Sequence, residues 1–599
     1  MIANVFKKLG FWVGLCFTAM TGNGAMAAEP AAPVQWIPDD AVIAVEVFQP
    51  KALLAPLCDE KNASMITAMP AYQRQESKPE FKKFQAGVKF LENQLGMDWL
   101  TALTKLTGGG IAFGVCPEQR MVLVADAEDG QMLTQLHETF SKITAHKNGG
   151  PSSGEASSQE VEGVTAWSFG PKEAHAIIGK RLVASSGIEG LRAALALRGK
   201  NGASSLAATP AYQAARRAVG PDAIGMVFLN MEVLRQVPAI GNVLKPNGDN
   251  PLASLLFAGV AETANSSKWL ALGLHVKETG LVLQLASDGA KFDPKGPSAF
   301  ALPDRAGEGA LPNLTVPRQI AALSFYRDLH RFYAAKDQLF PERSSGLVFF
   351  ENMMGIFFSG RDLTDDVMAQ TTPHIRLVVA NQRYESAAEA PTLRIPAFAA
   401  ILELRNPDQC HELVEEAWQK AVGLANVTRG QKAEPGLIIE RPVHWTTKYT
   451  VARYSTANIK DKSQRDARYN YRPSLAMPGR HLILSSTEDL ACDLMDALGR
   501  EDKQKVSPLA QTHSVVDLDG DKLAAAVLAN RDAWMRQNML KSGGTGEGNS
   551  AGLDWFIGVA SFVHHLSLKF DAEGGTSQAW LELNFKSPSP AGQKVAEAR

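Results

Sequence analysis

Apolar and polar positions follow one recurring pattern along this chain. Short segments that alternate or are continuously apolar, such as residues 42–47 and 121–127, are each followed by a stretch with helical periodicity. The same succession recurs in the second half, where residues 399–404 precede a helical pattern over 408–422. Further predicted strands lie at residues 111–115, 182–186, 224–229, 320–325, 482–486 and 515–518, and further predicted helices at 129–146, 188–197, 231–237, 488–498 and 522–528.

Each half of the chain closes on a predicted β-hairpin. Residues 269–287 and 566–585 each place two strand patterns around a glycine-containing turn, at residues 278–280 and 573–575. Strands joined by hairpins are antiparallel neighbours, which predicts an α+β fold with mainly antiparallel sheets and helices packed on a face. A doubly wound α/β fold is the alternative, and the hairpins and alternating strands argue against it.

Three short sequence matches recur in the same order in the two halves. The last two pairs are separated by 300 and 299 residues, and the first by 259. This agreement in order and spacing predicts two diverged copies of one unit and disfavours chance similarity. In the first match, residues 90–93 with Gly96 correspond to residues 349–352 with Gly355. In the second, Leu182 with Ser185-Ser186 corresponds to Leu482 with Ser485-Ser486. In the third, residues 257–261 correspond to residues 556–560.

The matches predict the domain organisation. The first copy spans residues 33–293 and the second residues 312–586, followed by a C-terminal tail at 587–599. Residues 294–311, with several prolines and glycines, have the composition of a linker. The separation between matched segments grows from 259 to 300 residues along the chain. This growth predicts net insertions in the second copy, at residues 359–392 and 455–478.

The first residues have the three-part pattern of a secretory signal peptide. Lys7 and Lys8 precede an uncharged apolar run over residues 9–21, and Ala25-Met26-Ala27 provides small residues for cleavage between Ala27 and Ala28. The run is shorter than the roughly 20 residues of a membrane-spanning helix. We therefore expect an exported protein, periplasmic or secreted, with residues 1–27 removed. An uncleaved segment acting as a short anchor is the alternative.

Composition narrows the classes of partner. The chain has 61 Lys and Arg against 63 Asp and Glu, so no overall charge favours nucleic acid. No segment after the signal peptide is apolar enough to predict a transmembrane helix in the mature chain. Four cysteines, Cys58, Cys116, Cys410 and Cys492, are too sparse for a disulfide scaffold and are predicted to be buried thiols, although an oxidising compartment permits one or two bridges.

Several strand entries and helix starts of the first copy form a recognisable set, at residues 37–45, 95–98, 106–110 and 205–207, with Pro210 and Tyr212. Together they resemble an exported bacterial family known as domain of unknown function 3352. The resemblance implies an exported location and this architecture, and it brings no established activity. It is thinner in the second copy, where residues 370–373 stand in place of the glycine run.

Familiar chemical motifs give no cofactor or metal prediction. Residues 107–110 contain three glycines but precede a strand pattern, which favours a tight turn over a phosphate-binding loop. Residues 517–521 begin like a calcium loop, yet the glycine is two positions early, so helix capping by Asp519 is favoured. His564 and His565 are adjacent on a predicted strand and would project to opposite faces. His411 has no second histidine four residues later, as a zinc motif would require.

The insertion at residues 455–478 is the predicted binding segment. Cationic and aromatic side chains alternate in it, a combination that suits an anionic or carbohydrate-like surface. A solvated hairpin loop is the competing interpretation. The candidate binding residues are Lys460, Lys462, Arg465, Arg468, Tyr469, Tyr471 and Arg472.

These observations predict a non-enzymatic exported protein that binds or scaffolds a component of the cell envelope, with an anionic component as the favoured partner. A secreted or periplasmic hydrolase whose catalytic residues are scattered in sequence is the alternative.

Overall fold

The computed structural model describes most of the chain after its N-terminal segment. The described residues are 32–58, 67, 72–73, 76, 79–147, 157–168, 172–198, 202–236, 250–277, 280–289, 292–384, 390–455, 466–542, 547–573 and 576–585. They form two compact units. Within the described ranges, the first unit contains residues up to 236 together with 267–289, and the second contains 250–266 together with 292–585.

Residues 250–266 and 294–311 belong to the second unit. The sequence predicts the former in the first copy and the latter in a linker. The first contains α12 (Pro251–Leu256) and α13 (Val260–Ser266). The second, residues 294–311, contains α14 (Pro297–Ala301), and its Ala301, Leu302 and Ala310 are buried. Burial of these apolar side chains makes residues 294–311 a packed part of the second unit.

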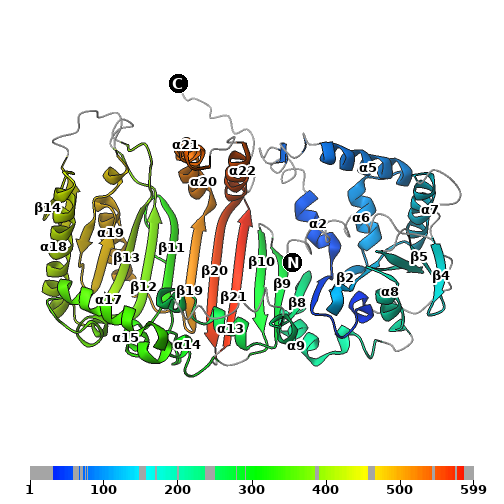
Figure 1. Cartoon of the computed structure of the whole chain (residues 1–599), viewed down its shortest axis with the longest axis horizontal. Coiled ribbons are helices and arrows are strands. Elements are labelled where there is room, and N and C mark those ends of the chain that lie inside the picture. The colour runs from blue at the N-terminus through cyan, green and yellow to red at the C-terminus, as the bar shows by residue number, and fades with distance from the viewer. Residues whose placement is uncertain are drawn as a thin grey trace. The chain divides into compact units, whose positions relative to one another are not determined.

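The first unit is built on one antiparallel sheet (Figure 1). Its described strands lie in the order β4-β5-β6-β7-β3-β2-β1-β8-β9-β10, and every pairing is antiparallel. The strands are β1 (Ile43–Val47), β2 (Gly110–Val115), β3 (Met121–Asp126), β4 (Ser157–Val161), β5 (Val164–Ser168), β6 (Ala174–Ile178), β7 (Arg181–Ser185), β8 (Gly225–Asn230), β9 (Trp269–Lys277) and β10 (Gly280–Ser287).

Helices cover both faces of this sheet. On one face, α8 (Ile188–Leu195) and α9 (Pro210–Val219) pack with Val122 and Val124 of β3. On the other, α6 (Trp99–Thr107) and α7 (Gly130–Lys147) pack with Ile177 and Leu182. The remaining elements are α2 (Pro50–Cys58), α5 (Pro79–Leu95), α10 (Met231–Leu234), η1 (Pro33–Trp36), η2 (Pro117–Gln119) and η4 (Leu206–Ala208).

The second unit has its own antiparallel sheet. Its principal strands lie in the order β14-β16-β17-β18-β13-β12-β11-β19-β20-β21, and the short β15 pairs with β16. The strands are β11 (Gln319–Tyr326), β12 (Thr371–Ala380), β13 (Ala397–Leu404), β14 (Leu437–Glu440), β15 (Val443–His444), β16 (Thr447–Tyr454), β17 (Ser474–Ala476), β18 (His481–Ser485), β19 (Thr512–Asp519), β20 (Val563–Glu573) and β21 (Thr576–Phe585).

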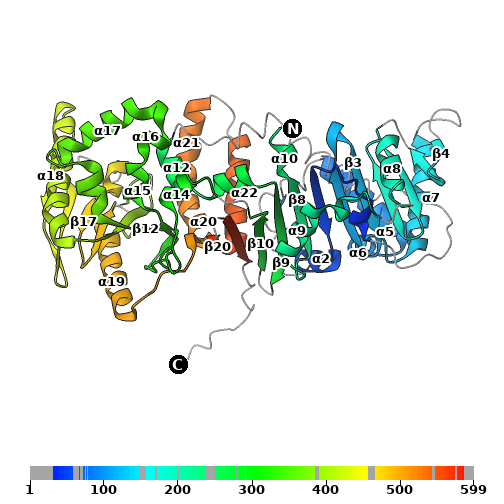
Figure 2. The same cartoon turned by 90° about the horizontal axis from the view of Figure 1, so that it is seen from below.

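The helices of the second unit include the long α18 (Pro407–Gln431), which contacts α17 (Ser344–Phe357) (Figure 2). Leu490, Leu494 and Leu498 of α19 (Glu488–Gln504) are buried against the sheet. The other elements are α15 (Leu329–Ala334), α16 (Lys336–Leu339), α20 (Gly520–Ala529), α21 (Arg531–Ser542), α22 (Glu547–Phe562), η5 (Pro341–Arg343), the π-helical turn η6 (Leu363–Val367), η7 (Met368–Gln370) and η8 (Ala467–Asn470).

The predicted α+β class is confirmed by these large antiparallel sheets and their helices. Helices cover both faces of the first sheet, whereas the sequence predicted them on one. The principal strands of the two units also follow the same spatial order. No helix in the described part of the chain is long and apolar enough to cross a membrane.

Candidate functional site

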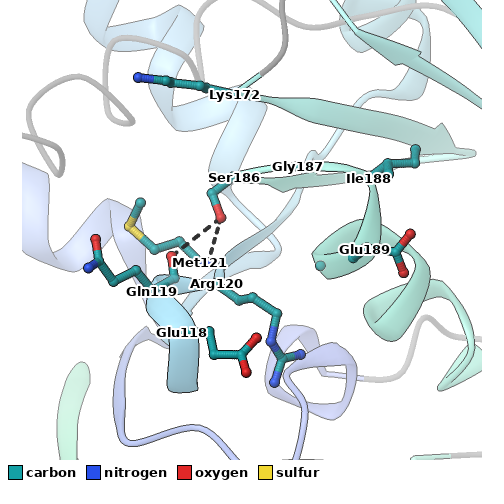
Figure 3. A pocket seen from close by; sticks show the side chains of 10 residues that line it. Glu118, Gln119, Arg120, Met121, Lys172, Ser186, Gly187, Ile188 and Glu189 are labelled. Carbon is teal, nitrogen blue, oxygen red and sulfur yellow. Dashed lines mark hydrogen bonds between the residues drawn. The ribbon is translucent and has the colours of Figure 1, made fainter.

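The first unit contains a pocket of about 410 Å³ between the β2–β3 turn and the start of α8 (Figure 3). Strand β3 pairs with β7, which brings the turn before β3 next to the β7–α8 junction. Cavities of a few hundred Å³ are the usual size of small-ligand sites. The pocket is lined by Glu118, Gln119, Arg120, Met121, Lys172, Ser186, Gly187, Ile188, Glu189 and Gly190.

The turn at the edge of this pocket has an unfavourable backbone conformation for its residues. Glu118 and Gln119 have φ angles of 58° and 62°, in the left-handed region, and the N–H of Arg120 donates to the Pro117 carbonyl at 3.3 Å. Two successive left-handed residues make a type I′ hairpin turn, for which Asn-Gly is the preferred sequence. Each non-glycine residue there costs about 1–2 kcal/mol. Such strain is concentrated at functional sites in proteins.

A second hairpin of the same unit shows that this strain is avoidable. The β4–β5 turn has Glu162 and Gly163 at its two central positions, with φ angles of 50° and 69°. Glycine adopts this conformation without a steric penalty. The β2–β3 turn therefore carries one more strained side chain than its neighbour, and both of its strained residues line the pocket.

Ser186 joins the two sides of the pocket. Its N–H donates to the Met121 carbonyl and its Oγ accepts from the Met121 N–H, each at 3.0 Å. The hydroxyl can also donate to the Gln119 carbonyl at 3.5 Å, as the dashed lines in Figure 3 indicate. This hydroxyl therefore serves to hold strand ends together.

Acidic and basic side chains both reach the pocket. Arg120 forms an ion pair with Asp40, which neutralises it. Glu189 lies 3.7 Å from Arg192 in a solvent-exposed pair, a contact worth little in stability. Burial, together with Asp40, raises the pKa of the neighbouring Cys116 to about 12, so this thiol is not a nucleophile at neutral pH.

The described lining residues supply several kinds of group for recognition. An activated serine nucleophile needs an adjacent general base, most often a histidine. The described lining residues include no histidine, and the Ser186 hydroxyl pairs with backbone groups. The pocket offers a hydroxyl, backbone groups, two apolar side chains and mixed charges, which suit recognition of a ligand.

The predicted insertion site is only partly within the described residues. Lys460, Lys462 and Arg465 lie outside them, as do Ala27 and Ala28 at the predicted cleavage site. The described part, residues 466–478, belongs to the second unit and includes strand β17 of its sheet. Its candidate residues Arg468, Tyr469, Tyr471 and Arg472 each have a described contact.

The cationic residues of this described part have partners within the chain. Arg468 forms an ion pair with Asp466 at 2.9 Å and lies 3.9 Å from Glu434. Hydrogen bonds from Arg468 lower the pKa of Asp466 below its ordinary value. The Arg472 backbone N–H donates to the Ser486 carbonyl at 2.9 Å.

The aromatic residues of the same segment contact other rings. Tyr469 lies edge-on to Tyr454, with ring centroids 6.2 Å apart. Tyr471 lies edge-on to Phe398, with centroids 6.4 Å apart. These contacts hold residues 469–472 against the second sheet.

Asn470, which the sequence did not single out, anchors this segment. Its side chain is 1% exposed and donates to the carbonyls of Leu393 and Ala467 at 2.7 and 2.8 Å. Its Oδ1 accepts from the Ile395 N–H and from the Tyr384 hydroxyl. The sequence gives no signal for this role because the partners lie up to 86 residues away.

A buried histidine pair is a second feature that sequence reasoning missed. The Nε2 atoms of His137 on α7 and His175 on β6 lie 3.1 Å apart, and His175 Nδ1 lies 3.1 Å from Glu173. Burial and the neighbouring His175 lower the pKa of His137 to about 3. The two imidazoles are 2% and 0% exposed and pack on Trp167, so they join α7 to the sheet.

The other sequence motifs have structural roles. Asp519 caps α20 by accepting from the Lys522 N–H at 2.9 Å, which confirms the capping prediction. Residues 107–110 form the turn from α6 to β2. His564 and His565 pair with different carboxylates, Asp521 and Asp517. Among the described residues, no group of histidines, cysteines and carboxylates could hold a metal ion.

Comparisons with known proteins add little to this geometry. No family model and no curated protein matches the chain. Among solved structures, crystal forms I and III of TP0453 match with TM-scores of 0.19 and 0.22 at 10% identity. Each match covers 44% of this chain, and 82% and 83% of the TP0453 chains respectively. TM-scores this low carry no argument about fold or function.

Proposed function

We propose that this chain is an exported, non-enzymatic protein of the cell envelope that binds a ligand in the pocket of its first unit. The strained β2–β3 turn is the observation that carries the proposal. Glu118 and Gln119 both have left-handed backbone conformations, and both line the pocket. A binding role for their side chains explains why the favourable Asn-Gly sequence is absent.

The proposed location depends on the N-terminal sequence. Residues 1–27 have the charged, apolar and small-residue regions of a secretory signal, and the resemblance to the exported family agrees with that. N-terminal sequencing of the mature protein tests this part of the proposal. A mature chain beginning at Ala28 is expected, and one beginning at Met1 would contradict removal of the signal.

The proposed scaffold is two diverged copies of one unit. The matching order of the principal strands supports this, as does a shared contact between strand ends. Ser486 exchanges two hydrogen bonds of 2.8 Å with the Phe398 backbone, in the way that Ser186 does with Met121. Both serines lie in the second of the three sequence matches, in Ser185-Ser186 and Ser485-Ser486.

An obstructing substitution tests ligand binding at the pocket. An added Cβ at Gly187 meets no heavy atom within 4 Å, so Gly187→Trp would place its indole in the pocket region without a clash at Cβ. Gly423 on α18 has equally open space, and Gly423→Trp in the second unit is the matched control.

The assay is mass spectrometry of the envelope components that co-purify with each protein. We expect at least one component to be retained by the wild type and by Gly423→Trp and to be lost from Gly187→Trp. Identical sets of components from all three proteins would refute the proposed site. Both variants should keep the wild-type circular dichroism spectrum, because neither substitution enters a packed core.

A further inference from the structure

We propose that the ligand of this pocket is an extended peptide segment, in which an aromatic residue is followed by a residue whose backbone N–H pairs with the Ser186 carbonyl. This inference deepens the proposed function and rests on it. In the second unit, a segment of the chain itself occupies the corresponding position.

The two positions correspond through the strand pairings. Val122 pairs with Ser185 in the first unit, and Ala399 pairs with Ser485 in the second. Met121 and Phe398 therefore hold equivalent places, directly before these pairs, and Ser186 and Ser486 directly follow them. Ser186 exchanges hydrogen bonds with the Met121 backbone, and Ser486 does so with the Phe398 backbone, which supports the correspondence.

In the second unit, residues 471 and 472 cover this position. The ring of Tyr471 lies against Phe398, and the Arg472 N–H donates to the Ser486 carbonyl at 2.9 Å. Both residues lie in the connection between β16 and β17, which Asn470 holds in place. The chain itself thus places an aromatic ring against Phe398 and a backbone donor on the Ser486 carbonyl.

In the first unit the corresponding connection is much shorter. It joins Ser168 of β5 to Ala174 of β6, where the second unit uses the chain from Tyr454 to Ser474. Lys172 corresponds to Arg472 in sequence position, since each lies two residues before its strand. Among the described residues of the first unit, no backbone hydrogen bond joins Lys172 to Ser186. Lys172, Ser186 and Met121, which correspond to Arg472, Ser486 and Phe398, line the pocket of the first unit.

The lining side chains suit the proposed segment. Met121 replaces Phe398, and a thioether is a favourable neighbour for an aromatic ring. Ile188 adds an apolar side chain, and the carboxylates of Glu118 and Glu189 can attract a basic residue beside the aromatic one. An isolated anion is the less suitable ligand, because Glu189 in the first turn of α8 repels it.

The probe is a synthetic peptide with the sequence of residues 467–476, acetylated and amidated at its ends and labelled for fluorescence anisotropy. We expect it to bind the wild-type protein and Gly423→Trp equally, and Gly187→Trp roughly tenfold or more weakly. Replacing the tyrosine that corresponds to Tyr471 by alanine should also weaken binding roughly tenfold, the value of a lost aromatic contact and its burial.

Three outcomes would overturn the inference. The first is binding that is unchanged by Gly187→Trp, since the peptide would then be bound elsewhere. The second is no binding of the peptide, and the third is equal binding of the tyrosine and alanine peptides. If the peptide fails while Gly187→Trp still loses an envelope component, the pocket binds another class of ligand and the proposed function stands. If that component is also unaffected, both proposals fail.

Discussion

Relief of strain at the β2–β3 turn should stabilise the first unit and weaken its binding. The perturbation is the double substitution Glu118→Asn and Gln119→Gly, which installs the preferred type I′ sequence. The two left-handed residues now cost about 1–2 kcal/mol each. Asparagine tolerates the conformation better and glycine adopts it freely, but glycine loses about 0.5–1 kcal/mol through the greater entropy of the unfolded chain. The net gain is about 1–2 kcal/mol.

Differential scanning calorimetry measures this gain. A domain of this size shifts its Tm by roughly 2–4 °C per kcal/mol, so the transition of the first unit should rise by roughly 2–8 °C. The single substitution Glu162→Asn in the β4–β5 turn is the control, because glycine already follows it there. It should raise the Tm less and leave peptide binding unchanged.

The change in Tm and the change in peptide binding together test whether the strain serves binding. Higher stability with weaker binding of the 467–476 peptide indicates that strain is retained for function. An unchanged or lower Tm would show that the turn is not strained in solution. A higher Tm with full binding would show that Glu118 and Gln119 have no part in recognition.

Three further substitutions test other buried groups, each by urea unfolding. Burial raises the pKa of Glu46, which pairs with Tyr212, from 4.5 to about 7, so its contribution to stability is full below pH 4.5 and is lost as the pH rises to 7. Glu46→Gln should remove this loss of about 3 kcal/mol, and equal pH profiles for the two proteins would contradict it. Arg327 is 1% exposed and donates to four backbone carbonyls and the Ser514 hydroxyl, so Arg327→Met should cost about 3–5 kcal/mol; a cost below 1 kcal/mol would show that these acceptors find other donors. Asn470→Ala should cost about 2–4 kcal/mol through its lost hydrogen bonds, whereas an unchanged midpoint would show that residues 466–472 are not anchored by it.

Local pattern was sufficient to predict many of the elements of this protein. The alternating segments and helical stretches gave the central strands, α7, α8 and α19, and the closing hairpins, because side-chain period reports directly which face of an element is buried. The cap at Asp519 was equally accessible, since it depends on residues within one turn of helix. Proline and glycine content did not reveal burial in residues 294–311, where Ala301, Leu302 and Ala310 are buried.

The pocket could not be predicted in this way. It exists because β3 pairs with β7, which brings Met121 to Ser186 across 65 residues of sequence. The strain at Glu118 and Gln119 has no sequence signal either, since the residues that prefer such a turn are absent from it.

The sequence by itself thus determined the fold class, many of the strands and helices and the candidate signal peptide, all of which follow from short-range patterns. The tertiary structure decided which strand ends meet, which connection covers the second sheet and where the pocket of the first unit lies. These features depend on contacts between distant segments, and the residues that make them carry no local mark of their partners.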